Sequence, residues 1–204
     1  MRRFIHALIV CLFVFTSCSW NTSSTIILHP KKTGICTVRF HDQSRQRPLI
    51  TEVWYPIDEN TPAENVQGLW LRCAEARDAP IKAAKKKYPL IVMSHGNGGD
   101  RMNNSWLAEI LASNGYIVAS VDHHGNTWNN KIAECFIKIW ERPQDVSFVV
   151  DQLLEHEWLS KHINHKKIGF IGYSLGGHTG IWIAGGKIPE FRSEERRVGK
   201  ECRL

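Results

Sequence analysis

The chain has 204 residues and a formal net charge of +6, with 43% hydrophobic and 23% charged residues. Arg2, Arg3 and a net two positive charges within residues 192–203 supply four of these six charges, so little excess remains for the body of the protein. The basic cluster at 82–87 is therefore interpreted as a solvated helix end or loop. No DNA- or RNA-recognition motif accompanies it, so a nucleic-acid partner is not expected. The chain has no internal repeat, low-complexity segment or second domain.

The N-terminus has the pattern of a secretory signal peptide over residues 1–19. Two arginines precede an apolar run at 4–15 that is too short to remain as a bilayer-spanning helix. We therefore expect an exported bacterial protein, whether periplasmic, secreted or lipid-anchored. The segment 15–18 approximates a lipobox, in which Cys18 is lipidated and anchors the protein to a membrane, although Phe15 departs from that pattern. Plain cleavage near Ser19 stays open as the alternative.

Six cysteines are present, and half of them fall outside the expected mature domain. Cys36, Cys73 and Cys135 remain inside it, which allows at most one internal disulfide in an exported protein. No pair has the spacing of a zinc site, so the sequence predicts no metal.

Hydrophobic periodicity predicts an α/β sandwich with right-handed crossovers, preceded by an antiparallel hairpin. Strands are predicted at 34–40, 49–55, 89–94, 116–121 and 167–172, and helices at 102–113, 143–158 and 175–185. The last three strands are nearly continuous apolar runs, typical of parallel strands covered on both faces. We expect the active site at their carboxyl ends.

A glycine-rich loop, His95-Gly96-Asn97-Gly98-Gly99, follows the strand at 89–94. Alone, this pattern suits a flexible turn or a phosphate-binding loop. It lacks the Lys-Ser/Thr ending of a P-loop, and its glycines do not fit G-x-G-x-x-G. The loop alone does not indicate a function, and a second motif is needed to assign one.

Three aromatic residues occur between 126 and 140, after the strand that ends near Asp122. Trp128, Phe136 and Trp140 are candidates for the wall of an apolar acyl pocket, with simple core packing as the alternative. Asp122, His123 and His124 come before Ser174 in the chain, which is the wrong order for a catalytic acid and base that follow a serine nucleophile. We therefore interpret them as residues that cap and shape their loop.

The segment Gly172-Tyr173-Ser174-Leu175-Gly176 continues directly from an apolar strand and opens a helical pattern. This G-x-S-x-G context is that of a nucleophile elbow, in which glycines let strand and helix pass closely and the serine hydroxyl is exposed. Ser174 is the predicted nucleophile. The backbone N–H groups of Asn97 and Leu175 are the predicted oxyanion-hole donors, one from each glycine motif.

These motifs together resemble the bacterial α/β-hydrolases grouped as predicted dienelactone hydrolases, close to the platelet-activating-factor acetylhydrolase type. The resemblance spans residues 34–186 and rests on the glycine loop, the elbow and the segments Glu52-Val53-Trp54-Tyr55-Pro56, Ala119–Thr127 and Arg142-Pro143-Gln144-Asp145-Val146. It implies a serine esterase that acts on carboxylic esters with short-acyl or lipid-like groups, with a small-molecule ester as its partner and no cofactor.

The C-terminal residues from about 192 are charged, lack apolar periodicity and resemble a translated sequencing adapter. We therefore expect residues 20–191 to be the N-terminal part of an α/β-hydrolase fold, with a mostly parallel sheet, helices on both faces and the distal strands missing. In this fold the triad acid and base follow the serine, yet residues 175–204 contain no aspartate and no histidine beyond His178. The sequence thus predicts an ester hydrolase inactive in this form, or alternatively an exported binding protein with a hydrolase-like fold. It does not indicate an oligomeric state.

Overall fold

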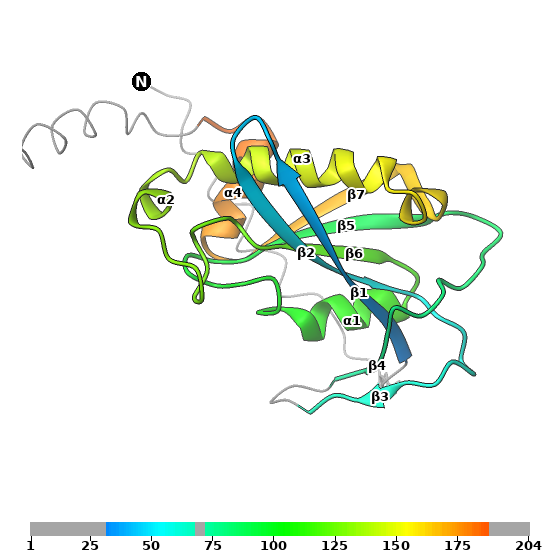
Figure 1. Ribbon diagram of the computed structural model, residues 1–204. Coiled ribbons are helices and arrows are strands. Elements are labelled where there is room, and N and C mark those ends of the chain that lie inside the picture. The colour runs from blue at the N-terminus through cyan, green and yellow to red at the C-terminus, as the bar shows by residue number, and fades with distance from the viewer. Residues whose placement is uncertain (1–31, 68–71, 188–204) are drawn as a thin grey trace, which may run out of the picture.

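The computed structural model describes residues 32–67 and 72–187 (Figure 1). The predicted signal peptide at 1–19, the lipidated Cys18 and the non-native tail at 192–204 lie outside the described residues and stay predictions. Within the described part, no helix combines the length and apolar character needed to cross a bilayer.

The described residues form a sheet of seven strands, and its centre is the α/β arrangement that the periodicity predicts. The strands are β1 (Lys32–Asp42), β2 (Arg47–Tyr55), β3 (Glu64–Asn65), β4 (Ala74–Arg77), β5 (Tyr88–Ser94), β6 (Ile117–Val121) and β7 (Ile163–Gly172). Their order is β3-β4-β1-β2-β6-β5-β7. The hairpin β1–β2 is antiparallel, β2 joins the central strands antiparallel to β6, and β5 pairs in parallel with both β6 and β7.

Helices cover both faces of this sheet (Figure 1). They are α1 (Ser105–Ser113), α2 (Ala133–Ile137), α3 (Glu141–Glu155) and α4 (Leu175–Ile183), with a 3-10 turn, η1, at Leu159–Lys161. Because side chains alternate across a strand, Trp54 packs in one core with Ala108 and Ala112 of α1. Its neighbour Val53 packs in the core that includes residues of α3.

Helix α1 ends as the sequence predicts. Asn114 caps it, and Gly115 follows with a φ of 91°, a backbone conformation that glycine adopts without the penalty a Cβ brings.

The prediction that all three parallel strands are covered on both faces is correct for β5 and β6 but wrong for β7. Every residue of β6 is buried, whereas β7 is largely half-buried or exposed, and Ile168 is 41% exposed. The reason is position: β7 lies at the edge of the sheet formed by the described residues. An apolar run alone does not distinguish an edge strand from a central one.

Candidate active site

Ser174 lies in the sharp turn between β7 and α4, with φ 52° and ψ −119°. Only Gln46, Asp78 and Ser174 among the described non-glycine residues have a positive φ. This backbone region is sparsely populated because the Cβ crowds the main chain, so the surrounding structure must hold the residue there.

Two glycines allow this turn. A Cβ placed on Gly172 would overlap the Gly176 carbonyl and lie 2.6 Å from the Gly177 nitrogen. A Cβ placed on Gly176 would overlap the Ser94 carbonyl oxygen at the end of β5. Both obstacles are backbone atoms, so the elbow packs more tightly than any other residue type permits.

The glycine loop 95–99 lies next to this elbow. The Tyr173 amide donates to the Ser94 carbonyl at 3.2 Å, and a Cβ on Gly96 would come 3.3 Å from the Ser174 Cβ. The two glycine motifs, some eighty residues apart in sequence, therefore meet at the carboxyl ends of β5 and β7, the edge where the sequence predicts the active site.

The amides of Asn97 and Leu175 are available for a ligand, since neither donates a hydrogen bond to another described residue. By contrast, the Gly98 amide is bonded to the Asn126 Oδ1 at 3.0 Å and the Gly99 amide to the Gly96 carbonyl at 3.2 Å.

The Ser174 side chain is exposed, and its hydroxyl has no hydrogen-bond partner among residues 32–67 and 72–187. The nearby His178 ring bonds the Ser174 main-chain carbonyl at 3.3 Å rather than the hydroxyl. The Ser174 hydroxyl is thus exposed, and no base among the described residues is bonded to it.

A buried Ser–His–Asp chain, which the sequence analysis missed, lies within the same end of the sheet. The Ser94 hydroxyl donates to the His123 Nε2 at 2.8 Å, and the His123 Nδ1 donates to the Asp145 Oδ2 at 2.9 Å. These residues are at most 1% exposed, so Ser94 cannot meet a substrate. The signal available in the sequence was Asp145, which belongs to the Arg-Pro-x-Asp segment at the start of α3.

Asp145 is the centre of a wider ionic cluster. Its carboxylate accepts hydrogen bonds from Arg45 at 2.9 Å and from two nitrogens of Arg47, each at 2.7 Å. Burial by itself would raise the pKa of Asp145, but the bonds from His123 and Arg47 outweigh it and hold the pKa below its ordinary value.

Asp122 and His124, which follow β6, connect their loop to neighbouring segments. Asp122 accepts hydrogen bonds from the backbone and the guanidinium of Arg101, just beyond the glycine loop. The His124 carbonyl accepts from Arg47 at 3.4 Å.

His95 and His123 are held as neutral rings. The His123 amide donates to the His95 Nε2 at 3.2 Å, so the His95 proton is on Nδ1 and bonds the Gly96 carbonyl at 2.7 Å. Burial, together with the charge of Arg142, lowers the pKa of His95 to about 4 and that of His123 to about 3.

Acidification is therefore expected to destabilise the fold as the pH falls from about 6.5 toward 4. The pKa of His95 is lower in the folded chain, so the unfolded chain binds more protons in this window and stability is lost as the pH falls. His95 alone corresponds to roughly 3 kcal/mol at 1.36 kcal/mol per unit. Urea unfolding at stepped pH measures the loss.

The matched variants for this pH experiment are His95→Gln and His165→Gln. The first removes the buried ring and should flatten the pH dependence, whereas the second removes an exposed ring on β7 and should leave it unchanged. Equal pH slopes in His95→Gln and the unmodified protein would contradict the assignment.

Two of the three aromatic candidates lie against the glycine loop. Phe136 lies over the glycine loop, 3.6 Å from a Cβ placed on Gly98. Trp128 is 62% exposed and is tied to the same loop by its amide, which bonds the Gly99 carbonyl at 3.2 Å. Trp140 is half-buried at the start of α3. Phe136 and Trp128 therefore adjoin the site, while their contact with a substrate stays a prediction.

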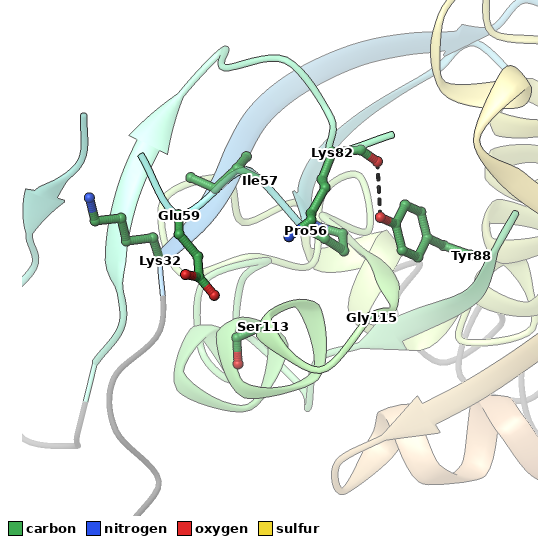
Figure 2. A pocket seen from close by; sticks show the side chains of 8 residues that line it. All are labelled: Lys32, Pro56, Ile57, Glu59, Lys82, Tyr88, Ser113 and Gly115. Atoms are coloured by element: carbon green, nitrogen blue, oxygen red, sulfur yellow. Dashed lines mark hydrogen bonds between the residues drawn. The ribbon is translucent and has the colours of Figure 1, made fainter. Parts of the chain in front are cut away.

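A cavity of about 420 Å³ lies at the other end of the sheet (Figure 2). Tyr88, which begins β5, and Gly115, which precedes β6, line it, whereas Ser174 follows the opposite end of β7. The Tyr88 hydroxyl donates to the Lys82 carbonyl at 2.9 Å (Figure 2). This cavity is separate from the elbow.

Cys36 and Cys135 are free thiols in the described structure. Over the same residues, no group of three or more histidine, cysteine, aspartate or glutamate side chains is arranged to hold a metal ion.

The chain has the α/β-hydrolase fold, as the sequence predicts. Among solved structures, it is similar to a ferulic acid esterase from Streptomyces cinnamoneus, with a TM-score of 0.62, 24% identity, and coverage of 77% of this chain and 59% of the esterase. This likeness establishes the fold.

The family comparison agrees with the resemblance seen in the motifs. Residues 66–137 match the profile of the family described as platelet-activating factor acetylhydrolase, isoform II. The match contains the glycine loop and the segment after β6 but ends before Ser174.

Curated relatives are hydrolases as well. The chain is 26% identical over 141 residues to a dipeptidyl-peptidase 5 of Schizosaccharomyces pombe, covering 66% of this chain and 19% of the relative. It is 27% identical over 109 residues to a dipeptidyl-peptidase 5 of Porphyromonas gingivalis, covering 49% and 15%. The chain thus spans less than a fifth of the length of these relatives. Fold, profile and relatives together agree with the α/β-hydrolase resemblance carried by the motifs.

Proposed function

We propose that this protein is a serine hydrolase of carboxylic esters with short-acyl or lipid-like groups, and that Ser174 is its nucleophile. The observation that carries this proposal is the strained backbone of Ser174, which presents an unbonded hydroxyl beside the glycine loop. A strained and exposed serine at a strand–helix turn is a costly arrangement that a purely structural loop does not need.

In the proposed reaction, the Ser174 Oγ attacks the acyl carbonyl and gives its proton to solvent water. The carbonyl oxygen becomes an oxyanion, which the amides of Asn97 and Leu175 stabilise, because neither amide donates to another of the described residues. Collapse of this intermediate breaks the ester C–O bond, and the alcohol leaves with a proton. Water then hydrolyses the acyl-Ser174 bond and releases the acid.

The described residues place no base at the Ser174 hydroxyl, which therefore stays protonated near neutral pH. We accordingly propose that this chain turns over esters slowly. An oxyanion hole without a complete triad still accelerates acyl transfer by about 10³–10⁴ over water. That residual rate is measurable with an activated ester.

The test is hydrolysis of p-nitrophenyl acetate by the chain and by Ser174→Ala. We expect the unmodified chain to release p-nitrophenolate faster, with the acetyl group recovered on the peptide that contains residue 174. Ser147→Ala, which removes an exposed serine on α3, is the matched control and should behave like the unmodified chain.

Equal rates for the chain and Ser174→Ala would contradict the proposal. That outcome would favour the alternative class, an exported binding protein with a hydrolase-like fold and no turnover.

A further inference from the structure

We propose that Asn126 and Arg142 are positioning residues that fix the glycine loop 95–99 so that the Asn97 amide stays free beside Ser174. This inference rests on the proposed roles of Ser174 and the Asn97 amide. It assigns a purpose to the buried polar groups that the reaction itself does not touch.

Asn126 clamps the loop from the segment after β6. Its Oδ1 accepts from the Gly98 amide at 3.0 Å, and its Nδ2 donates to the Asn97 Oδ1 at 2.9 Å. The side chain is 1% exposed, so water does not compete for these bonds. The Asn126 side chain therefore binds the side chain of Asn97 and the backbone N–H of Gly98. The backbone N–H of Asn97 itself donates to none of the described residues.

Arg142 supports this clamp from the start of α3. It donates to the Asn126 Oδ1 at 3.1 Å, to the Ser94 hydroxyl at 3.2 Å and to the His95 carbonyl. The guanidinium thus ties the end of β5, the first loop residue and the Asn126 side chain together. Its planar donors suit this role, because several acceptors are fixed by one rigid group.

The charge of Arg142 adds to its positional role. It is 1% exposed, and no carboxylate of the described residues accepts a hydrogen bond from it. Burial lowers its pKa to about 9, so it remains a cation at neutral pH. Because Arg142 is bonded to the loop and to Asn126, its fixed positive charge favours the negative oxygen of the transition state.

The buried Ser94–His123–Asp145 chain orients Arg142. Asp145 fixes the His123 ring, and the ring accepts a hydrogen bond from the Ser94 hydroxyl. The Ser94 oxygen is thereby left to accept from Arg142. These residues have the connectivity of a catalytic triad, but their serine is buried, so they orient the guanidinium instead of attacking a substrate.

The test compares Asn126→Ala with Asn129→Ala in the full chain. Asn129 lies in the same segment and is exposed, and within the described part of the chain its side chain accepts only from the Thr127 hydroxyl, so it is the matched control. Two quantities are measured: acetylation of Ser174 by p-nitrophenyl acetate at varied ester concentration, and hydrogen–deuterium exchange of the amides at 97–99.

For Asn126→Ala we expect the acetylation rate at saturating ester to fall by about ten- to a hundredfold, because a misplaced oxyanion donor acts on the transition state. The half-saturating ester concentration should stay within about twofold, since ground-state binding is not affected. Exchange should accelerate at Gly98, whose amide loses its bond to the Asn126 Oδ1, and at the adjoining Gly99. Asn129→Ala should match the unmodified chain in acetylation rate, half-saturating ester concentration and amide exchange.

A purely structural role predicts a different pattern, namely a lower melting temperature with an unchanged acetylation rate, and that result would overturn the inference. If Asn126→Ala does not fold, Asn97→Ala removes the other end of the clamp from an exposed side chain and should slow acetylation by about threefold. If the unmodified chain is not acetylated at Ser174, the proposed function fails. The exchange measurement then still decides whether Asn126 holds the loop.

Discussion

Replacing Asp145 by asparagine is expected to lower the free energy of unfolding by about 3–5 kcal/mol, the usual effect of removing one partner of a buried charge pair. The carboxylate accepts from Arg45, Arg47 and His123 in a site that is 0% exposed. An asparagine of the same shape turns an NH₂ group toward donors and leaves the guanidinium of Arg47 buried without its counter-ion. Urea unfolding followed by circular dichroism measures the change, with the slope m as a check on two-state behaviour.

The control for this substitution is Asp151→Asn, on the same helix but exposed. Surface substitutions of this kind change stability by less than about 0.5 kcal/mol. A change below about 1 kcal/mol in Asp145→Asn would mean that the cluster contributes little, in line with the small value of exposed ion pairs.

The central strands, the main helices and the elbow could be predicted because their signals are local. The apolar runs of β5 and β6 give nearly correct strand bounds. The pair Asn114-Gly115 directly follows the last residue of α1 and marks its end. Gly172, Ser174 and Gly176 indicate a strained turn by residue type alone, since only glycines tolerate the backbone contacts found there.

The polar network could not be predicted, because its bonds join residues that are far apart in sequence. Asp145 meets Arg47 across 98 positions, and Arg142 meets Ser94 across 48. Hydrophobic periodicity is a local signal and carries no information about such distant pairs. The short elements β3, β4 and α2 were also missed, since two to five residues carry too little pattern to outweigh turn composition.

The substitution Gly176→Ala is expected to have the largest effect, a loss of about 4 kcal/mol or more of unfolding free energy. A Cβ at this position overlaps the Ser94 carbonyl oxygen and lies 2.7 Å from its carbon and 2.9 Å from the His95 carbonyl oxygen. All three are backbone atoms at the end of β5, so no side-chain rotation relieves the contact. Overpacking usually costs about 1–3 kcal/mol, and a blocked backbone places this case beyond that range. Urea unfolding of the purified variant measures the loss.

The neighbouring glycine supplies the control within the same turn of helix. A Cβ on Gly177 meets only the Gly172 carbonyl oxygen at 3.5 Å, an ordinary contact. Alanine is favoured over glycine in a helix by up to about 1 kcal/mol, so Gly177→Ala should be neutral or stabilising. If both substitutions were tolerated alike, β5 and the elbow would not be in the close contact described. The proximity of the Asn97 amide to Ser174, on which the proposed oxyanion hole depends, would then lose its support.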